Sequence, residues 1–199
     1  MKHHSLLPDK RGPVKRGPVK RGPWTTLQSE IKYTNPWITV REDQVVCPNG
    51  SEGIYGVVEP KIAVSVVALS PDNEIYLVGQ YRYPTEKYSW ELIEGGVEKG
   101  EDPLVAIKRE LAEEAGLGAK NWEILSRDIQ LSNCYTSEIA HLYLATELYP
   151  ASGVPDPTEQ LAVKVVAFSD AVNMVLSGEI TDALSMIGIL LAARKIATS

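Results

Sequence analysis

An arginine and three glutamates that stand close together in the sequence are the residues best placed to do chemistry: Arg109, Glu110, Glu113 and Glu114. At helical spacing Glu110 and Glu114 lie side by side, one turn apart, and Glu113 lies within reach of Glu110. Like charges arranged in this way destabilise an isolated helix. A solvated acidic surface is the ordinary interpretation of any one glutamate pair. Carboxylate oxygens are, however, the ligands that Mg²⁺ requires, so the cluster also predicts a divalent-cation site.

A helix over residues 103–115 must position these side chains. Asp102 is a favourable N-cap residue, Pro103 suits the first helical position, and Gly116 suits the residue after the last turn. The apolar residues of this segment fall on one stripe of a helical wheel, and they predict the buried face: Leu104, Ile107, Leu111 and Ala115. The glutamates then lie on the flank of that stripe.

The sequence around the helix resembles the Nudix hydrolase family. A glycine is followed after five residues by a glutamate, and after seven more by the run REL-x-EE-x-GL. The positions that match the Nudix box are Gly95, Glu101, Arg109, Glu110, Leu111, Glu113, Glu114, Gly116 and Leu117. The resemblance implies an α/β (α+β) fold, namely a Nudix-type α/β/α sandwich with a mixed sheet, and cleavage of a pyrophosphate linkage.

The resemblance also implies roles for individual residues. It gives Glu110 and Glu114 as metal ligands, Glu113 as a frequent third ligand, and the carbonyl of Glu94, just before the first box glycine, as a further one. Arg109 resembles an orienting residue of the catalytic site that acts with Glu101. The implied cofactor is Mg²⁺, with Mn²⁺ as a substitute, which would neutralise pyrophosphate oxygens and activate a water molecule.

Two further motifs resemble the ADP-ribose and nucleotide-sugar pyrophosphatase branch of the family. They are QYRYP at residues 80–84 and WEL at residues 90–92. The branch implies that Arg82 contacts a substrate phosphate and that Glu91 lies near the metals, although a lone arginine is usually an ordinary surface residue.

The loop after the helix carries the last implied catalytic residue. Glu138 matches a mobile-loop glutamate proposed as general base, with Glu113 or Glu114 as alternatives. Asn133 stands where ADP-ribose pyrophosphatases often have proline, so GDP-mannose or an ADP-sugar competes with ADP-ribose as the substrate.

The N-terminal part divides into two segments. Residues 1–23 contain the repeat KRGPVKRGPVKRGP with seven basic residues against one acidic residue, and they predict a disordered basic arm. Residues 24–59 contain short alternating runs that predict a small β subdomain. In the branch that this chain resembles, the subdomain exchanges between subunits, which implies a homodimer and an aromatic that stacks on the base. Tyr33, Trp37 and Tyr55 are the candidates, with burial in a hydrophobic core as the alternative.

Residues 60–199 predict the Nudix catalytic domain. Apolar strands are expected at residues 62–69 and 74–83, joined by a turn at residues 71–73 into a central hairpin. Further strands are expected at residues 139–146 and 161–168. Two helices near residues 170–176 and 182–197 complete the α/β/α pattern, with Thr181 as an N-cap and packing as the only role of the last helix.

Composition limits the classes of function. Outside residues 1–23 the chain carries 13 basic against 25 acidic residues, a balance that disfavours a nucleic-acid partner. The sequence shows no apolar run of membrane-spanning length and matches no disulfide or zinc spacing, so we expect a cytoplasmic protein without membrane contact.

The leading hypothesis is hydrolysis of a nucleoside diphosphate sugar. The alternatives are a housecleaning Nudix hydrolase of nucleoside triphosphates or dinucleotides, and a non-catalytic, ligand-sensing Nudix domain.

Overall fold

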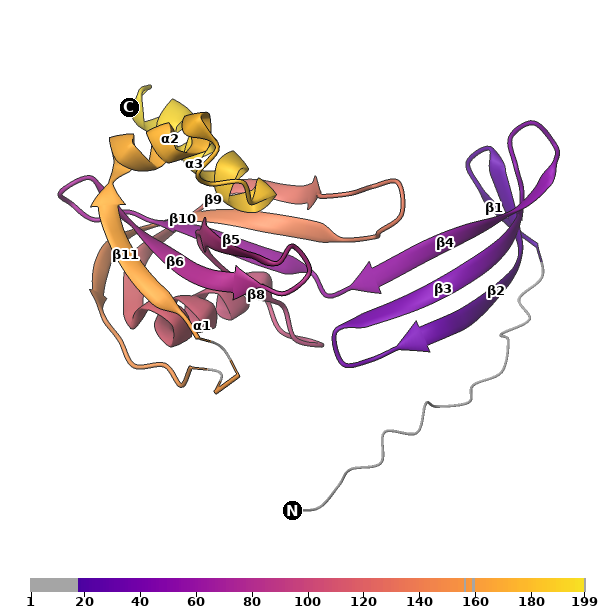
Figure 1. Cartoon of the computed structure of the whole chain (residues 1–199), viewed down its shortest axis with the longest axis horizontal. Coiled ribbons are helices and arrows are strands. Elements are labelled where there is room, and N and C mark those ends of the chain that lie inside the picture. The colour runs from indigo at the N-terminus through magenta and orange to yellow at the C-terminus, as the bar shows by residue number, and fades with distance from the viewer. Residues whose placement is uncertain (1–17, 156, 159, 199) are drawn as a thin grey trace, which may run out of the picture. The chain divides into compact units, whose positions relative to one another are not determined.

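The chain forms two compact units in a computed structural model that describes residues 18–155, 157–158 and 160–198 (Figure 1). The N-terminal unit contains residues up to Lys61 together with the loop Ser132–Glu138. The larger unit contains Ile62–Leu131 and the chain from Ile139 onwards. Each unit is described by itself below.

The N-terminal unit is an antiparallel sheet with the strand order β1-β2-β3-β4. The strands are β1 Val19–Arg21, β2 Trp24–Thr34, β3 Ile38–Val46 and β4 Glu52–Pro60. Asn35 forms the turn between β2 and β3, because its side-chain oxygen accepts the N–H groups of Trp37 and Ile38 at 2.9 and 2.7 Å. The strands expected between residues 24 and 59 are therefore present.

The loop Ser132–Glu138 is part of this N-terminal unit although it follows the box helix by sixteen residues or more in the sequence. The N–H of Val58 on β4 donates to the carbonyl of Tyr135 at 2.8 Å, and the carbonyl of Val58 accepts from Ser137 at 3.0 Å. The hydroxyl of Tyr55 donates to the carbonyl of Cys134 at 2.6 Å. The loop thus pairs alongside β4, and it belongs to the N-terminal unit although the sequence assigns residues 60–199 to one domain.

The described part of the larger unit contains two sheets and three helices. The first sheet is mixed and has the order β8-β5-β10-β9, with β10 parallel to β5 and antiparallel to β9. The second sheet has the order β11-β6-β7. The strands are β5 Ala63–Ala68, β6 Glu74–Arg82, β7 Lys87–Glu91, β8 Ile93–Gly96, β9 Leu117–Gln130, β10 Ile139–Pro150 and β11 Ala162–Ala167. The helices are α1 Pro103–Ala115, α2 Phe168–Ser177 and α3 Ala183–Ile196.

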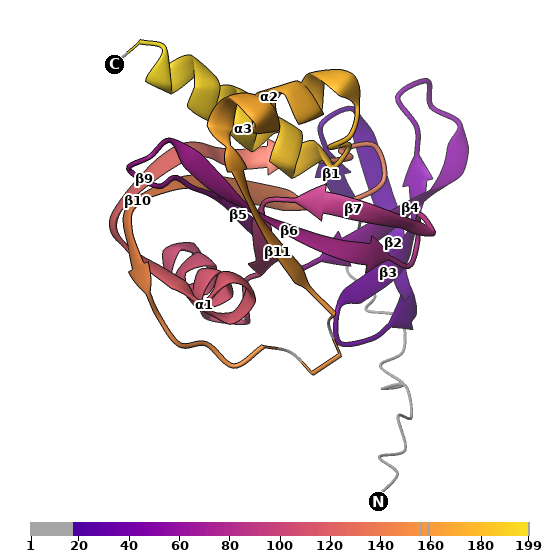
Figure 2. The ribbon, with the colours of Figure 1, turned by 60° about the vertical axis from the view of Figure 1, so that its left-hand side comes forward.

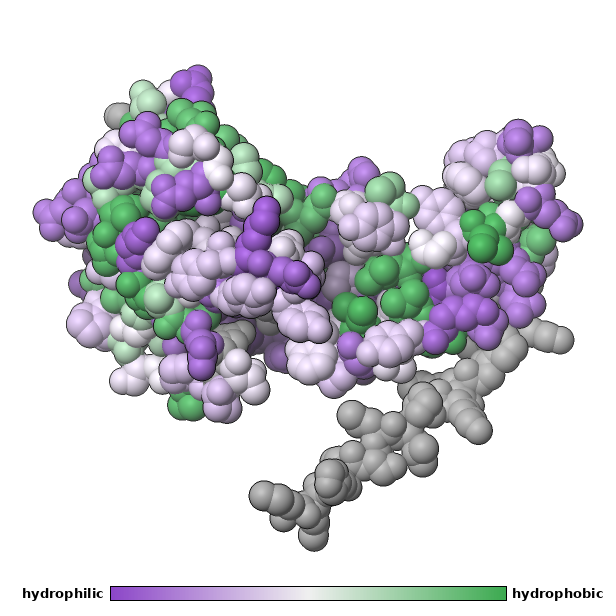
Figure 3. Space-filling model, in the orientation of Figure 1, coloured by the Kyte–Doolittle hydropathy of each residue, from purple (hydrophilic) through white to green (hydrophobic). Residues whose placement is uncertain are grey.

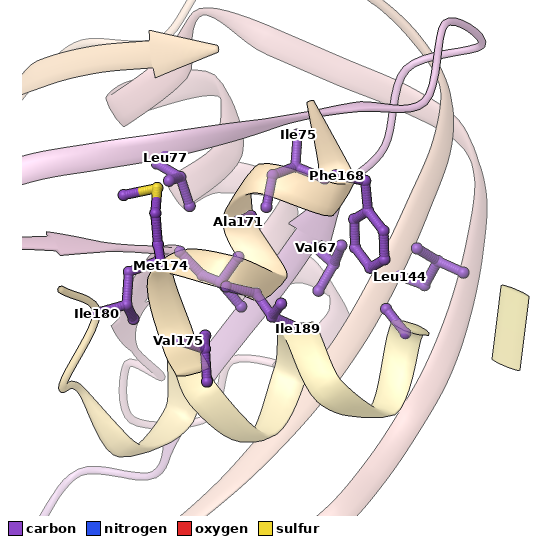
Figure 4. Close-up of a cluster of buried hydrophobic side chains, with 12 residues drawn as sticks. Val67, Ile75, Leu77, Leu144, Phe168, Ala171, Met174, Val175, Ile180 and Ile189 are labelled. Carbon is purple, nitrogen blue, oxygen red and sulfur yellow. The ribbon is translucent and has the colours of Figure 1, made fainter. Parts of the chain in front are cut away.

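Helices cover the sheets from opposite sides, with α1 on one side and α2 and α3 on the other (Figure 2). Strand β5 is apolar on both faces for this reason. Its Val64 and Val66 pack in a cluster with Ile107 and Leu111 of α1, whereas Val67 packs with residues of α2 and α3. Figure 4 shows this second cluster, in which Val67 lies near Phe168. The α/β/α sandwich expected from the resemblance is confirmed.

The prediction of a central hairpin over residues 62–83 is wrong. The turn is present, since Asn73 donates to the carbonyl of Ser70 at 3.1 Å, but the strands on either side enter different sheets. Strand β5 pairs with β8 and β10, and β6 pairs with β7 and β11. Only a single bridge, between Leu69 and Ile75, joins the two segments within the described residues. Both strands are apolar because helices cover both sheets. The pattern of residues therefore does not show that β5 and β6 belong to different sheets.

Other elements differ from the expectations in smaller ways. Strand β9 has no counterpart among them, because its polar and apolar residues do not alternate regularly. Strand β1 lies inside the segment expected to be disordered, so that prediction is wrong for Val19–Arg21, while residues 1–17 lie outside the described residues. Asp182, and not Thr181, caps α3, since its carboxylate accepts the N–H of Ser185 at 2.8 Å. No helix of the described chain has the length and apolar character needed to cross a membrane.

Candidate functional site

Helix α1 begins and ends at the residues that the sequence indicates. The Asp102 carboxylate accepts the N–H groups of Leu104 and Val105 at 2.9 and 3.4 Å, and Pro103 occupies the first turn. Gly116 adopts a left-handed conformation with φ of 65° and closes the last turn. Ile107 and Leu111 are fully buried. This packing fixes the rotation of the helix, so that its acidic side chains face the end of strand β8.

Arg109 joins the carboxylates of the helix into one cluster. Its Nη1 lies 2.7 Å from Glu110 and 3.1 Å from Glu113, and its Nε lies 3.1 Å from Glu101. Its Nη2 also donates to the carbonyl of Gly96 at 3.2 Å. Hydrogen bonds to Glu101, Glu110 and Glu113 together raise the pKa of Arg109 beyond its already high value. The guanidinium is therefore a permanent charge that fixes three carboxylates relative to the β8 loop.

The β8 loop lies directly against the helix. A Cβ atom at Gly95 would overlap the carboxyl group of Glu110, so only glycine allows this approach. The N–H of Glu94 donates to Glu114 at 3.4 Å. The structure thus brings together Glu94, Arg109, Glu110, Glu113 and Glu114, all of which the resemblance places at the site.

A second group of carboxylates lies on the other side of β8. One oxygen from each of Glu91, Glu94 and Asp182 falls within 4.8 Å of the others. The Glu94 carboxyl accepts from the hydroxyls of Ser185 at 3.0 Å and Ser65 at 3.3 Å. Burial raises the pKa of Glu94 well above its usual value, and the neighbouring Asp182 and Glu91 raise it further. We call this second group the β8–α3 cluster.

The contribution of α3 to this cluster is not evident from the sequence. Ser185 is fully buried, and its hydroxyl accepts the N–H of Leu92 at 2.9 Å as well as contacting Glu94. The expectation that the last helix only packs is therefore incomplete. The sole signal is the presence of Asp182 at a helix start, and no spacing relates it to residues some 90 positions earlier.

Arg82 and Glu91, which the resemblance places near substrate and metal, are partners of one another. The Arg82 Nε lies 3.0 and 3.1 Å from the two Glu91 oxygens, and its Nη2 contacts the same carboxylate. Glu91 is only 3% exposed, so the guanidinium supplies the charge that its burial requires. The hydrogen bond to Glu91 raises the pKa of Arg82.

A pocket of about 450 Å³ opens beside this ion pair within the larger unit. The turn between β6 and β7 and the start of α3 form its walls. Its lining is mainly polar and includes Arg82, Lys87, Glu91 and Asp182. We call it the α3 pocket.

The remaining expected site residues belong to the N-terminal unit. Tyr33 and Trp37 are 55% and 68% exposed, which is contrary to the alternative of a hydrophobic core. Tyr55 instead packs edge-on against Trp24, with ring centroids 5.4 Å apart. Glu138 ends the Ser132–Glu138 loop, where its N–H donates to the Thr136 hydroxyl at 3.1 Å. The roles of these residues at the site stay predictions.

The donor set of the α1 cluster fits a hard divalent cation. Glu110, Glu113 and Glu114 supply carboxylate oxygens from one face of the helix, and the peptide of Glu94 lies next to them. No nitrogen or sulfur ligand accompanies these oxygens in the described cluster. Oxygen-only sets of this kind suit Mg²⁺ or Mn²⁺ better than Zn²⁺ or Cu²⁺.

Comparisons with known proteins agree with this geometry. A family model described as NUDIX domain matches residues 59–183, and one described as Nucleoside diphosphate sugar hydrolase N-terminal domain matches residues 24–58. The chain is 34% identical to the ADP-ribose pyrophosphatase of Mycobacterium tuberculosis (strain ATCC 25618 / H37Rv) over 169 residues, covering 83% of this chain and 81% of that protein. It is 32% identical to the ADP-ribose pyrophosphatase of Bacillus subtilis (strain 168) over 160 residues, covering 79% and 86%.

A solved structure has the same fold. The crystal structure of an ADP compounds hydrolase superposes with a TM-score of 0.77 at 22% identity, covering 92% of this chain and 96% of that one.

Proposed function

The chain belongs to the Nudix hydrolase family, and we propose that it hydrolyses the pyrophosphate bond of a nucleoside diphosphate sugar, with ADP-ribose or a related nucleotide sugar as substrate. The products would be a nucleoside monophosphate and a sugar phosphate. The observation that carries the proposal is the convergence of the α1 glutamates and the Gly95 loop on one site, in a chain that also matches the nucleoside diphosphate sugar hydrolase N-terminal domain.

We propose Mg²⁺ as the cofactor, held by Glu110, Glu113, Glu114 and the carbonyl of Glu94, with Mn²⁺ as a substitute. When bound, the cation would neutralise phosphate oxygens and lower the pKa of a water molecule. Arg109 would keep the glutamates in position through its contacts with Glu110 and Glu113.

Hydrolysis adds one water across one P–O bond. The water oxygen forms a bond to one phosphorus, the bond from that phosphorus to the bridging oxygen breaks, and the bridging oxygen leaves with the other phosphate. In the proposal Glu138 accepts the proton of the attacking water, and Glu113 or Glu114 is the alternative acceptor. Arg82 would stabilise negative charge on the substrate phosphates while Glu91 fixes its orientation.

The N-terminal unit would provide the base site and the dimer contact. Figure 3 shows apolar side chains, in green, on the visible face of its sheet. Exposed residues of the unit include Ile31, Tyr33, Trp37 and Ile54. Such a surface suits a homodimer in which Tyr33 or Trp37 stacks on the base. Sedimentation should then give a mass near twice 21.9 kDa, and a monomer at micromolar concentration would contradict the dimer. A cytoplasmic location stays a prediction.

The test of the proposed function is a product assay with Mg²⁺. ADP-ribose, ADP-glucose, GDP-mannose and ATP are supplied separately, and the products are identified by mass. Release of AMP or GMP together with a sugar phosphate is expected. Hydrolysis of ATP alone would contradict the proposed substrate class while leaving the family unchanged.

A further inference from the structure

The α3 pocket is lined by Arg82, which the proposed function places on a substrate phosphate, and by the start of α3, which has no role assigned toward the substrate. We propose that it receives the sugar phosphate half of the substrate, and that Asp182 and Thr181 at the start of α3 determine specificity for that half. This inference rests on the proposed function. The pocket volume of about 450 Å³ falls in the range of roughly 300–1,000 Å³ that is common for small-molecule sites.

The lining of the pocket suits a polyhydroxylated ligand. Thr85, Ser89 and Thr181 carry hydroxyls that can both donate and accept, and Glu91 and Asp182 carry carboxylates that accept. Sugar hydroxyls need this mixture, because each one donates a single hydrogen bond and accepts others. A nucleobase would need aromatic faces above and below its ring, and the lining lacks such a pair.

Tyr88 is the aromatic residue of the lining. Its ring makes an edge contact with Trp90, with centroids 5.6 Å apart and planes at 75°. One aromatic ring at the wall of a polar pocket can pack against the C–H face of a sugar, which gives the ligand an apolar contact without a stacking sandwich.

The pocket is lined by charges of both signs. Arg82 and Lys87, from the two strands of the β6–β7 hairpin, are its cations, and Glu91 and Asp182 lie beside Glu94 in the β8–α3 cluster. Arg82 is paired with Glu91, and Lys87 and Asp182 add a second cation and a second carboxylate to this ion pair. A sugar phosphate can use both signs of charge, because its phosphate can bind the cations and its hydroxyls can bind the carboxylates.

Asp182 is oriented before any ligand arrives. It caps α3 by accepting the N–H of Ser185 at 2.8 Å, so its side chain is fixed by a helix of fourteen residues. A ligand that binds a fixed acceptor orders fewer side chains, and this favours affinity. The capping role also offers a variant that keeps the helix start, since asparagine caps helices as well as aspartate does but lacks the negative charge.

The experiment measures binding of the two halves of the substrate separately. Ribose 5-phosphate and AMP are titrated into the full-length protein with Mg²⁺ by calorimetry, for the wild type and for Asp182→Asn. We expect the dissociation constant for ribose 5-phosphate to rise about tenfold, as for loss of a hydrogen bond to a charged group, and that for AMP to stay within about twofold.

Two other variants make the test robust. Thr181→Val removes a hydroxyl at similar size, and it should weaken ribose 5-phosphate binding in the same selective way without touching the N-cap. Glu179→Gln removes an exposed carboxylate just before α3 and outside the pocket, so it should change neither constant. Circular dichroism and melting curves establish that each variant is folded.

The outcomes separate this inference from the proposed function. Failure of the wild type to bind ribose 5-phosphate at millimolar concentration, or equal weakening of both ligands in Asp182→Asn, would overturn the assignment of the pocket. An enzyme that cleaves nucleotide sugars while Asp182→Asn binds normally would also overturn it. Selective weakening in a protein that cleaves no nucleotide sugar would support the pocket and reject the proposed function.

Discussion

Two groups of carboxylates lie within the larger unit, on either side of strand β8, and the protein stabilises them by different means. In the α1 cluster a single guanidinium, that of Arg109, contacts Glu101, Glu110 and Glu113. In the β8–α3 cluster the Glu94 carboxyl is held by the hydroxyls of Ser65 and Ser185. One guanidinium joins several carboxylates in the first group, whereas in the second group hydroxyls contact Glu94 and, among the described residues, Arg82 pairs with Glu91 alone.

Because of this difference, we expect the α1 cluster to bind a cation and the β8–α3 cluster to support the backbone of the neighbouring strands. The carboxylates of the α1 cluster lie beside a guanidinium that never loses its proton, and carboxylate oxygens are the ligands that a divalent cation requires. The pKa of Glu94 is raised by burial and by Asp182, which favours a neutral carboxyl at that position. Glutamates of the two clusters therefore differ in their surroundings, and we expect them to differ in function.

The largest effect is expected from Glu114→Gln in the α1 cluster. The change keeps the size of the side chain and its ability to accept from the N–H of Glu94, but it removes a charge that we assign to metal binding. Turnover of ADP-ribose should fall by orders of magnitude while the melting temperature changes little. Steady-state kinetics with Glu179→Gln as the control test this, and near-normal turnover would reject the metal assignment.

Arg109→Lys tests whether one cation must hold the whole cluster. Lysine keeps the charge but lacks the planar set of donors that reaches Glu101, Glu110 and the Gly96 carbonyl together. We expect a fall in kcat/KM of roughly 10–100-fold, as for loss of groups that orient metal ligands. An Arg109→Lys enzyme as active as the wild type would show that charge alone suffices.

Ser185→Ala tests how much the Ser185 hydroxyl of the β8–α3 cluster contributes to stability by accepting the N–H of Leu92. The variant leaves the N–H of Leu92 without its acceptor and removes one donor to Glu94, in a fully buried place. Unfolding in urea should show a loss of about 1–3 kcal/mol. Ser65→Ala is the matched comparison, because it removes only the longer bond to Glu94 and should cost less stability. Equal losses of unfolding free energy in the two variants would show that the hydrogen bond from the Leu92 N–H to Ser185 adds no stability of its own.

The smallest effect is expected from Glu94→Gln on the dependence of stability on pH. Because the pKa of Glu94 is higher in the folded protein than its ordinary value of 4.5, the folded state binds more protons, and stability falls as pH rises from about that value towards the raised pKa. The variant lacks this proton, so its unfolding free energy should fall less over the same interval. Urea unfolding in EDTA from about pH 4.5 upwards measures the difference, and parallel curves for the two proteins would contradict it.

The two clusters also differ in how far the sequence predicts them. The α1 cluster lies within one helix and one loop, where fixed spacing determines which side chains meet, so Asp102, Gly95 and the glutamates could be placed in advance. The β8–α3 cluster joins residues on strands and a helix that are distant in the sequence. Its contacts depend on how α3 packs, and neither Ser185 nor Asp182 carries a local signal for that.

The fold was predictable to a similar degree. The capping residues and apolar stripe of α1 determine its ends and its buried face locally, and the apolar runs of β5 and β6 identify them as strands. The strands with which β5 and β6 pair could not be predicted, because a strand covered on both faces has the same apolar residue pattern in either sheet. The bridge between Leu69 and Ile75 is where a continuous hairpin would have begun.

The attachment of Ser132–Glu138 to Val58 means that the protein is not modular along its sequence. A gene that lacks the codons for residues 1–61 would still encode the box helix and both sheets of the larger unit, but the loop that carries Glu138 would lose Val58 and Tyr55, the residues that hold it. If the N-terminal sheet were replaced by that of a related enzyme, the Ser132–Glu138 loop would likewise lie against residues of another protein. The N-terminal sheet and this loop should therefore be inherited, and engineered, as one piece.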